Sequence, residues 1–404
     1  MRKSLKITME PTTDPKNSKS KARYIMIGGF LGAGKTTAVA KLARKLTDQG
    51  LRVGLITNDQ GRELVDTLTL RSQGFETAEI LGGCFCCRFN SLIEASQKLS
   101  TKMRPDVFIA EPVGSCTDLV ATVTYPLRRL YGDDFTVAPV SVMVDPVRAL
   151  RVLGVEKGGG FSEKVAYIYA KQLEEADLIV VNKSELLDAA RLKALRAALA
   201  AKFPRTEVLA VSARQGTNLD AWFAWLTSET QATRETMKVD YDLYADGEAL
   251  MGWLNCTVQL TATKLFDADS LLQQLACEIQ KRLQAQQAEI AHLKMTFSAD
   301  GDHVAVANLV RNDFVPELSL KLGEPVKEGQ VIINLRAEAS PDVLAATVKE
   351  AVPAVAAQFP TVQAKLDHLE HFRPGRPSPT HREPAAACCS PRSACCAKPD
   401  PKGK

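Results

Sequence analysis

A glycine-rich segment near the start of the chain has the spacing of a phosphate-binding loop. Residues 29–36 read Gly-Phe-Leu-Gly-Ala-Gly-Lys-Thr and fit G-x-x-x-x-G-K-[ST], between an apolar run and an amphipathic stretch. Glycines let successive backbone N–H groups converge on phosphate oxygens, and the start of a helix adds its dipole. Lys35 is expected to reach the β- and γ-phosphates, and Thr36 to ligate Mg²⁺. The nucleotide-binding residues expected here are Gly29, Gly32, Ala33, Gly34, Lys35, Thr36 and Thr37.

Two later segments indicate which base the nucleotide carries. Asn182, Lys183 and Glu185 follow a predicted strand, at the place where GTPases carry N-K-x-D and the carboxylate binds guanine. Glu185 is one methylene longer than Asp, so its reach and its base selectivity change. Ser212 and Ala213 stand where a loop backbone contacts the guanine oxygen in such proteins. The order and spacing of these motifs favour GTP, with an ATP-dependent kinase or ATPase as the alternative.

A carboxylate ends another predicted strand. Glu111 opens the segment Glu-Pro-Val-Gly at 111–114. At the C-terminal edge of a parallel sheet it faces the phosphate loop and can order Mg²⁺ or its water. Gly114 lets the backbone approach the γ-phosphate. An ordinary turn at the end of a strand is the alternative.

Three cysteines within four residues point to metal chemistry. Cys84, Cys86 and Cys87 lie between the second and third predicted strands. Soft thiolates suit Zn²⁺ and Cu⁺, and three of them leave one coordination position open, as a carrier that releases its metal requires. Cys84 and Cys86 are the more natural chelating pair in an extended chain. A buried apolar cluster or a redox pair is the alternative.

The other seven cysteines fall into two groups. Cys388-Cys389 and Cys395-Cys396 form two adjacent pairs near the C-terminus, where they can act as a flexible tetrathiolate that captures metal and passes it to 84–87. A lipidated or merely oxidisable tail is the alternative. Cys116, Cys256 and Cys277 are expected to be single core residues, with Cys116 near the nucleotide.

Taken together, these motifs resemble the CobW branch of the CobW/HypB/UreG GTPases. The matching segments are 30–37, 84–87, 111–114 and 182–185, in the order found in that family, and the similarity covers about residues 23–225. The resemblance implies a metallochaperone-type GTPase that couples nucleotide hydrolysis to delivery of Zn, Co or Ni. A MeaB-like protector of a cobalamin (corrinoid) enzyme and a non-catalytic metal buffer are the alternatives.

The resemblance also implies roles for individual residues. Cys84, Cys86 and Cys87 would bind the transferred metal. Asn58-Asp59-Gln60-Gly61 stands where the family has a switch segment N-E-F-G, so Asp59 is a shortened acid, and Asp66 matches an acid a few residues on. The expected catalytic set is Lys35, Thr36, Glu111 and Asp59. No residue offers itself as a catalytic base, so slow intrinsic hydrolysis is expected.

The elements that must position these residues alternate between strands and helices. We expect strands at 24–27, 52–57, 106–110, 137–144, 177–181 and 207–211, with helices at 35–48, 188–203 and 218–228. Such alternation predicts an α/β fold with a mainly parallel sheet. A second unit is expected as α+β, with antiparallel strands at 253–261, 291–298, 303–310 and 331–337 and two helices, 268–288 and 341–358, on one face.

These patterns divide the chain into five parts. A disordered basic arm is expected at 1–22, a P-loop GTPase domain at 23–228, a linker at 229–250, the α+β domain at 251–371 and a disordered Pro- and Cys-rich tail at 372–404. The two ends are basic, and the body between them carries a net negative charge, although the whole chain is +4. An acidic body argues against a nucleic-acid partner.

The composition limits the location and the class of protein that the sequence can represent. The chain has 404 residues, 45% hydrophobic and 24% charged, without a run of about 18 apolar residues or a secretory signal. No membrane span and a cytoplasmic location are therefore expected. The expected partners are GTP and GDP, a client metalloprotein or corrinoid enzyme, and a second copy of the chain in a homodimer. We hypothesise that GTP and Mg²⁺ order the switch and change the geometry of the thiolates.

Overall fold

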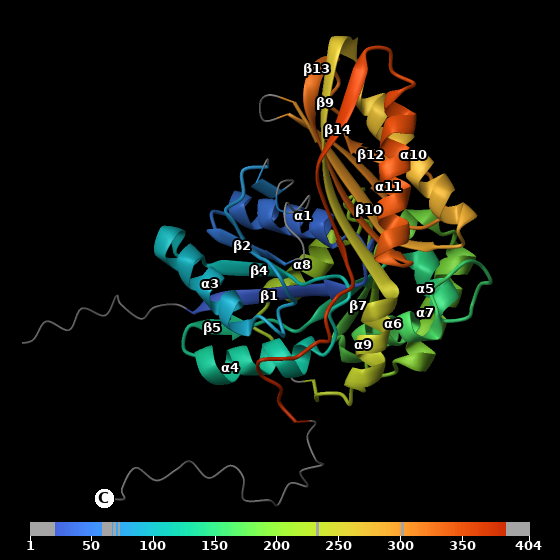
Figure 1. The fold of residues 1–404 in the computed structure, drawn as a ribbon. Coiled ribbons are helices and arrows are strands. Elements are labelled where there is room, and N and C mark those ends of the chain that lie inside the picture. The colour runs from blue at the N-terminus through green and yellow to red at the C-terminus, as the bar shows by residue number, and fades with distance from the viewer. Residues whose placement is uncertain are drawn as a thin grey trace, which may run out of the picture.

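The computed structural model describes residues 21–58, 67, 70–71, 73–231, 234–299 and 303–384, and every structural statement below concerns these residues. They form two domains that lie against each other, each on its own sheet (Figure 1). The first domain fills two apolar cores, one on each face of its sheet, and the second domain fills a third.

The first domain is built on a parallel sheet. Its strands run in the order β3-β2-β4-β1-β6-β7-β8, with β5 beside the start of β1. Most of them are short apolar runs buried on both faces, as a sheet covered by helices on both sides requires. The strands are β1 Ala22–Gly29, β2 Val53–Asn58, β3 Thr77–Ile80, β4 Val107–Glu111, β5 Phe135–Val137, β6 Ser141–Val144, β7 Leu178–Val181 and β8 Glu207–Ala210.

Helices cover both faces of this sheet. One face carries α1 and α8, and the other carries α3, α6 and α7. The helices are α1 Lys35–Asp48, α3 Phe89–Met103, α4 Tyr125–Tyr131, α5 Pro146–Val152, α6 Glu163–Glu175, α7 Ala189–Lys202, α8 Leu219–Thr227 and α9 Tyr241–Leu250, with a π-helical turn Val120–Thr124 and a 3₁₀ turn Ser184–Leu186. The expected parallel α/β fold is confirmed.

Two expectations about the first domain need correction. The single strand expected at 137–144 is two strands, β5 and β6, which pair with the beginning and the end of β1. Pro139 lies between them, and a residue without an N–H cannot continue the ladder. The segment expected as a linker also contains α9, which begins at the capping carboxylate of Asp240 and packs closely on α6, where a Cβ at Gly247 would lie 2.5 Å from the Lys164 carbonyl.

The second domain is an antiparallel sheet with two helices on one face. Its strand order is β12-β11-β10-β13-β9-β14, and α10 and α11 pack on the same side (Figure 1). The expected α+β architecture is confirmed, and β12 and β14 are additions to it. The elements are β9 Met251–Phe266, α10 Ala268–Ala285, β10 Glu289–Ser298, β11 Val304–Leu309, β12 Glu317–Leu320, β13 Val326–Glu338, α11 Pro341–Ala356 and β14 Val362–Phe372.

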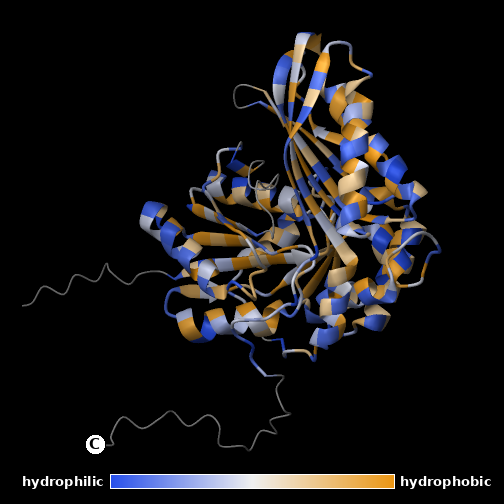
Figure 2. Ribbon diagram, viewed as in Figure 1, coloured by the Kyte–Doolittle hydropathy of each residue, from blue (hydrophilic) through white to orange (hydrophobic). Residues whose placement is uncertain are grey.

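The two faces of this second sheet differ in polarity. Along β10, Leu293 and Met295 belong to the core under the helices. His292 and Lys294 alternate with them and so point to the opposite face. Figure 2 shows apolar and polar colours alternating along these strands. The polar face is turned toward the first domain, which makes it a wall of the site described below.

The first part of the C-terminal tail lies on the first domain instead of being disordered. Residues 373–384, here called the C-terminal strap, run back from β14 over the first domain (Figure 1). Pro374 and Pro377 are buried, and Arg382 forms an ion pair with the buried Asp118 at 2.7 Å. Prolines prevent regular secondary structure here, but an extended chain can still bind a surface through its remaining N–H groups and side chains. The tail beyond Pro384, with its four cysteines, lies outside the described residues.

Candidate functional site

The phosphate-binding loop connects β1 to α1, as the sequence predicts. Gly34 has φ 92°, and a Cβ there would lie 2.4 Å from Nδ2 of Asn182, so both the conformation and the space require glycine. No side chain caps the start of α1. The Lys35 ammonium donates to the Gly29 carbonyl over 2.8 Å. A phosphate in the loop would offer this lysine a charged acceptor in place of a carbonyl.

A hydroxyl and a carboxylate meet at the expected magnesium position. Thr36 donates its hydroxyl to Oε1 of Glu111, 3.0 Å away, and both side chains are buried at the edge of the same pocket. Hard oxygen atoms of this kind are what Mg²⁺ takes from a protein, so these residues fit the ion. Gly114 lies so close to the loop that a Cβ would come within 2.8 Å of the Leu31 nitrogen.

The segment expected to bind the base is joined to the glycine-rich loop by hydrogen bonds. Asn182 donates to the Ala33 carbonyl over 2.8 Å, and its Oδ1 accepts from the Ala213 N–H at 2.9 Å. Lys183 donates to the Gly32 carbonyl over 2.8 Å. Glu185 lines the pocket together with these residues. The arrangement brings the two sequence motifs and the loop, far apart along the chain, to one cavity.

Most of the expected nucleotide-binding residues line this pocket. The lining residues among them are Gly32, Gly34, Lys35, Thr36, Thr37, Glu111, Gly114, Asn182, Lys183, Glu185 and Ala213. Gly29, Ala33 and Ser212 are not among the lining residues. Asp59, Gln60, Gly61 and Asp66 lie outside the described residues, so the expected role of Asp59 stays a prediction.

The second domain supplies a wall of the pocket that the sequence interpretation did not include. Lys294 donates to the Thr36 hydroxyl over 3.3 Å, and His292 lies beside it, buried. Burial, together with the nearby positive charges of Lys294 and Arg336, lowers the pKa of His292 well below its usual value, so the ring is neutral. The sequence did carry a signal for this wall, because His292 and Lys294 alternate with apolar residues along one strand. Such alternation places polar side chains on one face of a sheet, and that face must lie against water or another polar surface.

A buried carboxylate holds the two domains together beside the pocket. Asp145 accepts from Lys183 at 3.0 Å and from Arg311 of the second domain at 2.6 Å. Burial would raise the pKa of Asp145, but the positive charges of Lys183, Arg311 and Arg148 outweigh burial and lower it. Arg148 donates to the Leu31 carbonyl in the phosphate loop at 2.7 Å and to the Ile290 carbonyl of β10 at 3.2 Å. The position of the second domain is thereby tied to the loop.

The three clustered cysteines form a compact thiol group. The sulfur of Cys84 lies 2.7 Å from that of Cys86 and 3.1 Å from that of Cys87, and all three sulfurs lie within 4.8 Å of one another. The segment is a turn that leads into α3, with N–H groups of Cys87 and Arg88 donating to the Cys84 carbonyl. The extended chain assumed for the pair of Cys84 and Cys86 is therefore wrong, and the turn brings in Cys87 as well.

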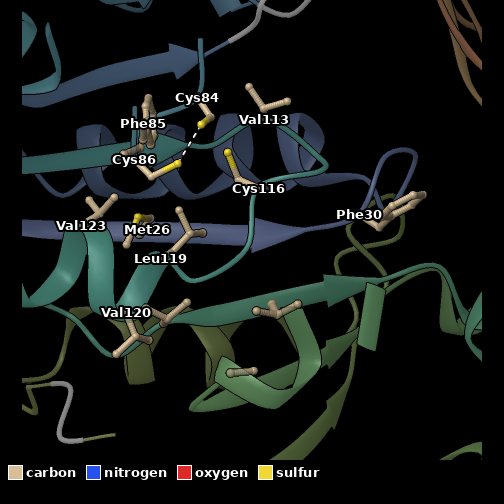
Figure 3. Close-up of a cluster of buried hydrophobic side chains, with 14 of the residues drawn as sticks. Met26, Phe30, Cys84, Phe85, Cys86, Val113, Cys116, Leu119, Val120 and Val123 are labelled. Carbon is tan, nitrogen blue, oxygen red and sulfur yellow. Dashed lines mark hydrogen bonds between the residues drawn. The ribbon is translucent and has the colours of Figure 1, made fainter. Parts of the chain in front are cut away.

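A fourth thiol lies against this cluster. Cys116 is 2% exposed and points toward Cys84 and Cys86 (Figure 3). It was expected to be alone, which the structure corrects. The neighbouring thiols of Cys116, Cys86 and Cys87 lower the pKa of the Cys84 thiol well below its usual value. Contact with Cys84 and burial raise the pKa of Cys87 to about 11. The sulfurs of this cluster are a soft donor set that fits a thiophilic ion.

The pocket and the thiol group are neighbours. Asn58, which lines the pocket, donates to the Gly83 carbonyl over 2.7 Å, one residue before Cys84. The strap covers the thiols from outside, because the Ser378 N–H donates to the sulfur of Cys87 at 3.2 Å and the Thr380 N–H donates to the Cys86 carbonyl at 2.8 Å. The thiols are therefore enclosed between the nucleotide site and the strap.

The other single cysteines differ from each other. Cys256 is buried in the second domain, as expected, whereas Cys277 is exposed on α10, which corrects the expectation of a core residue. No helix within the described ranges combines the length and the apolar composition needed to cross a membrane.

Comparison with known proteins identifies what the first domain is similar to. Residues 23–210 match the model of the CobW/HypB/UreG nucleotide-binding domain. The "Zinc chaperone CobW" of Sinorhizobium sp is 32% identical over 228 residues, which are 50% of this chain and 62% of that protein. The "Zinc chaperone YeiR" of Escherichia coli (strain K12) is 31% identical over 169 residues, 40% of this chain and 47% of that protein. This chain thus spans less than two thirds of the length of these curated relatives.

A solved structure also resembles this chain, at a lower sequence identity than the two zinc chaperones. The Zn(II)-bound YjiA GTPase from E. coli is 16% identical, with a TM-score of 0.37, over 84% of this chain and 99% of that one.

Proposed function

We propose, on the premise that residues 23–210 belong to the CobW/HypB/UreG nucleotide-binding family, that this protein is a GTP-hydrolysing metallochaperone. It would bind a transition metal ion at Cys84, Cys86 and Cys87 and pass the ion to a client metalloprotein under control of the nucleotide. The observation that carries the proposal is the hydrogen bond from Asn58, in the nucleotide pocket, to the Gly83 carbonyl beside the first of these thiols. The names of the relatives CobW and YeiR support Zn²⁺ as the cargo, with Co²⁺ or Ni²⁺ as the other candidates.

The pocket residues would divide the recognition of GTP between them. The loop around Gly34 would receive the phosphates through backbone N–H groups, and Lys35 would exchange the Gly29 carbonyl for phosphate oxygens. Asn182 would support the loop, and Glu185 would accept hydrogen bonds from the guanine edge. The second domain would add positive charge through Lys294.

Hydrolysis would transfer the γ-phosphoryl group to water and release GDP and phosphate. Thr36 and Glu111 would hold Mg²⁺, which neutralises charge on the β- and γ-phosphates. Lys35 and Lys294 would add positive charge on the same side of the phosphates. This assignment is consistent with slow intrinsic turnover, because positioning and charge are provided without a dedicated base.

Nucleotide and metal would be coupled through the segments that they share. A γ-phosphate that moves Asn58 or Gly114 would act on Gly83 or on the segment that leads to Cys116. Since binding free energies are linked, a metal ion must change the GTP affinity by the same factor by which GTP changes the metal affinity. A useful coupling is about 5- to 150-fold.

Equilibrium metal binding in three nucleotide states tests the proposal. Zn²⁺ affinity is measured against a competing chelator in the nucleotide-free protein, with GDP, and with a non-hydrolysable GTP analogue. We expect the affinity to differ at least fivefold between the GDP and GTP-analogue states, and Cys84→Ser to abolish tight binding. Equal affinities in all three states would reject the coupling. A guanine-versus-adenine competition assay checks the base, and preference for adenine would reject Glu185 as a guanine acceptor.

The alternative of a metal buffer that uses GTP only structurally makes a different prediction. Lys35→Ala removes the ammonium that contacts the phosphates, so a chaperone would lose both GTP turnover and nucleotide-dependent metal release. A buffer would keep its metal binding and release unchanged. Lys41→Ala, on the exposed side of α1, is the matched control and should alter neither property.

A further inference from the structure

The thiol group contains one more sulfur than the three-cysteine motif supplies. Cys116 comes from the segment after β4, more than 25 residues along the chain from Cys87. Its side chain is 2% exposed and belongs to the same buried core as Cys84 and Cys86. Figure 3 shows its sulfur directed at the same point as theirs. Thiols from two separate segments thus lie in the same part of the core.

The segment that carries Cys116 also lines the proposed nucleotide pocket. It begins at Glu111, which accepts from Thr36, and passes Gly114, which leaves no room for a side chain against Leu31 of the phosphate loop. Gln172 of α6 donates to the carbonyls of Gly114 and Cys116, over 2.9 and 2.8 Å. The short distance along the chain and the shared Gln172 amide tie the position of Cys116 to that of Gly114.

In this structure Cys116 lies near the three-sulfur group but is not yet placed as a fourth ligand of a metal ion bound there. The sulfurs that all lie within 4.8 Å of one another are those of Cys84, Cys86 and Cys87, and Cys116 is not among them. A tetrahedral zinc site with bonds of about 2.3 Å places its sulfurs about 3.8 Å apart. Cys116 would have to move toward the other three sulfurs to reach that spacing.

We propose that Cys116 is a fourth thiolate ligand that joins the metal in one nucleotide state and leaves it in the other. The inference rests on the proposed function, since it concerns the same metal and the same nucleotide. Four thiolates close the coordination sphere of a tetrahedral divalent ion and hold it tightly, whereas three leave a position for the ligand of a client. Withdrawal of Cys116 would be the step that makes the metal transferable.

The ion predicted by this arrangement is a thiophilic divalent ion with tetrahedral preference. Zn²⁺ and Co²⁺ meet that description, whereas oxygen-seeking ions such as Mg²⁺ do not. A purely structural role for Cys116, filling the core beside Val113 and Leu119, makes the opposite prediction, because its sulfur would then never contact a metal.

The test counts sulfur ligands in the full-length protein. Cys388, Cys389, Cys395 and Cys396 are replaced by serine, so that the tail cannot supply a sulfur. X-ray absorption of the zinc-loaded protein is recorded with GDP and with a non-hydrolysable GTP analogue. We expect four sulfur neighbours in one state and three in the other. Three in both states, or four in both, would overturn the proposal.

Variants give a second, independent readout. Cys116→Ser and Cys116→Ala should lower the Zn²⁺ affinity at least tenfold in the four-sulfur state only, and should reduce thiolate-to-Co²⁺ charge-transfer absorption by about a quarter in that state. Cys256→Ala, a buried cysteine of the second domain, is the matched control and should change neither. Nucleotide affinity of the metal-free variants reports whether they are folded.

The outcomes separate this inference from the proposed function. If Cys84→Ser abolishes metal binding while both Cys116 variants behave as the parent protein, only the role of Cys116 is rejected. If Cys84→Ser leaves metal binding intact, the metallochaperone function itself is rejected. If the Cys116 variants fail to fold, the sulfur count in the protein with an intact Cys116 still decides.

Discussion

Lys294 of the second domain donates a hydrogen bond to Thr36 of the phosphate-binding loop, with 3.3 Å between Nζ and Oγ1. The two residues come from different domains and are 258 positions apart. Thr36 is also the partner of Glu111, so the lysine reaches the expected magnesium and phosphate position. The second domain therefore forms part of the proposed nucleotide site.

Replacing this lysine should weaken nucleotide binding. Lys294→Met removes one positive charge from the pocket but keeps the length of the side chain. Loss of a hydrogen bond to a charged group costs about 1.5–3 kcal/mol, so GDP and GTP affinities should fall about tenfold or more. Calorimetric titration with each nucleotide measures this. Lys281→Met, on the exposed side of α10, is the control, and equal affinities in both variants would contradict a role for Lys294.

Removing the buried charge of Asp145 should destabilise the contact between the domains. Asp145→Asn takes a buried counter-charge from Lys183 and from Arg311, which then keeps only the half-exposed Asp313, and breaking a buried ion pair costs about 3–5 kcal/mol. Denaturant unfolding at neutral pH measures the loss. Asp313→Asn is the control, because Asp313 also pairs with Arg311 but is half exposed, and it should cost less than about 1 kcal/mol.

The stabilisation that the Asp145 carboxylate contributes should depend on pH in a defined direction. Its pKa is lower in the folded protein than in the unfolded chain, so its stabilisation is complete above the ordinary aspartate pKa and is lost as the pH falls through the folded value. The difference between the parent protein and Asp145→Asn should therefore shrink in acid. If the difference in unfolding free energy between the two proteins stayed constant down to the pH of acid denaturation, ionisation of Asp145 would not be its cause.

A buried glutamate should have the opposite pH dependence. Burial, together with the nearby Asp118, raises the pKa of Glu175 well above its usual 4.5. The folded protein then binds a proton that the unfolded chain has lost, so stability falls as the pH rises above 4.5, by about 1.4 kcal/mol per unit while the difference lasts. Glu175→Gln should remove this decline. Unfolding measured from pH 4 to 8 checks it, with the exposed Glu174→Gln as control, and an unchanged slope would mean that Glu175 is ionised in the fold.

Releasing the strap should open the thiol group. Arg382→Ala leaves Asp118 buried with the Tyr241 hydroxyl as its remaining partner among the contacts described, at 2.7 Å. We expect a loss of about 1–3 kcal/mol and faster protease cleavage within residues 373–384. Because Ser378 would no longer donate to Cys87, zinc should also exchange faster with a chelator.

The control for the strap is another arginine of the same segment. Arg376 pairs with Asp242 at the surface, where both side chains are more than half exposed, so Arg376→Ala should change stability by less than about 1 kcal/mol. Equal cleavage rates in the two variants would show that Arg382 does not anchor the strap.

The local motifs were readable from the sequence because their chemistry depends on neighbours along the chain. The phosphate loop needs glycines, Lys35 and Thr36 in one short run between a strand and a helix, and α1 begins at Lys35 as expected. Alternation of apolar runs with amphipathic stretches determined the parallel sheet, and Cys84, Cys86 and Cys87 were close in sequence before they were close in space.

Long-range contacts were decided only by the tertiary structure. Nothing in the spacing of Cys116 joins it to Cys84, because that contact depends on how the segment after β4 passes the turn before α3. Lys294 reaches Thr36 only because the polar face of the second sheet is packed on the first domain. Composition likewise indicated disorder after 372, but the buried Asp118 provides Arg382 with a charged partner that no local pattern reveals. Short-range spacing thus fixed the chemical groups, and packing between distant segments fixed which of them act together.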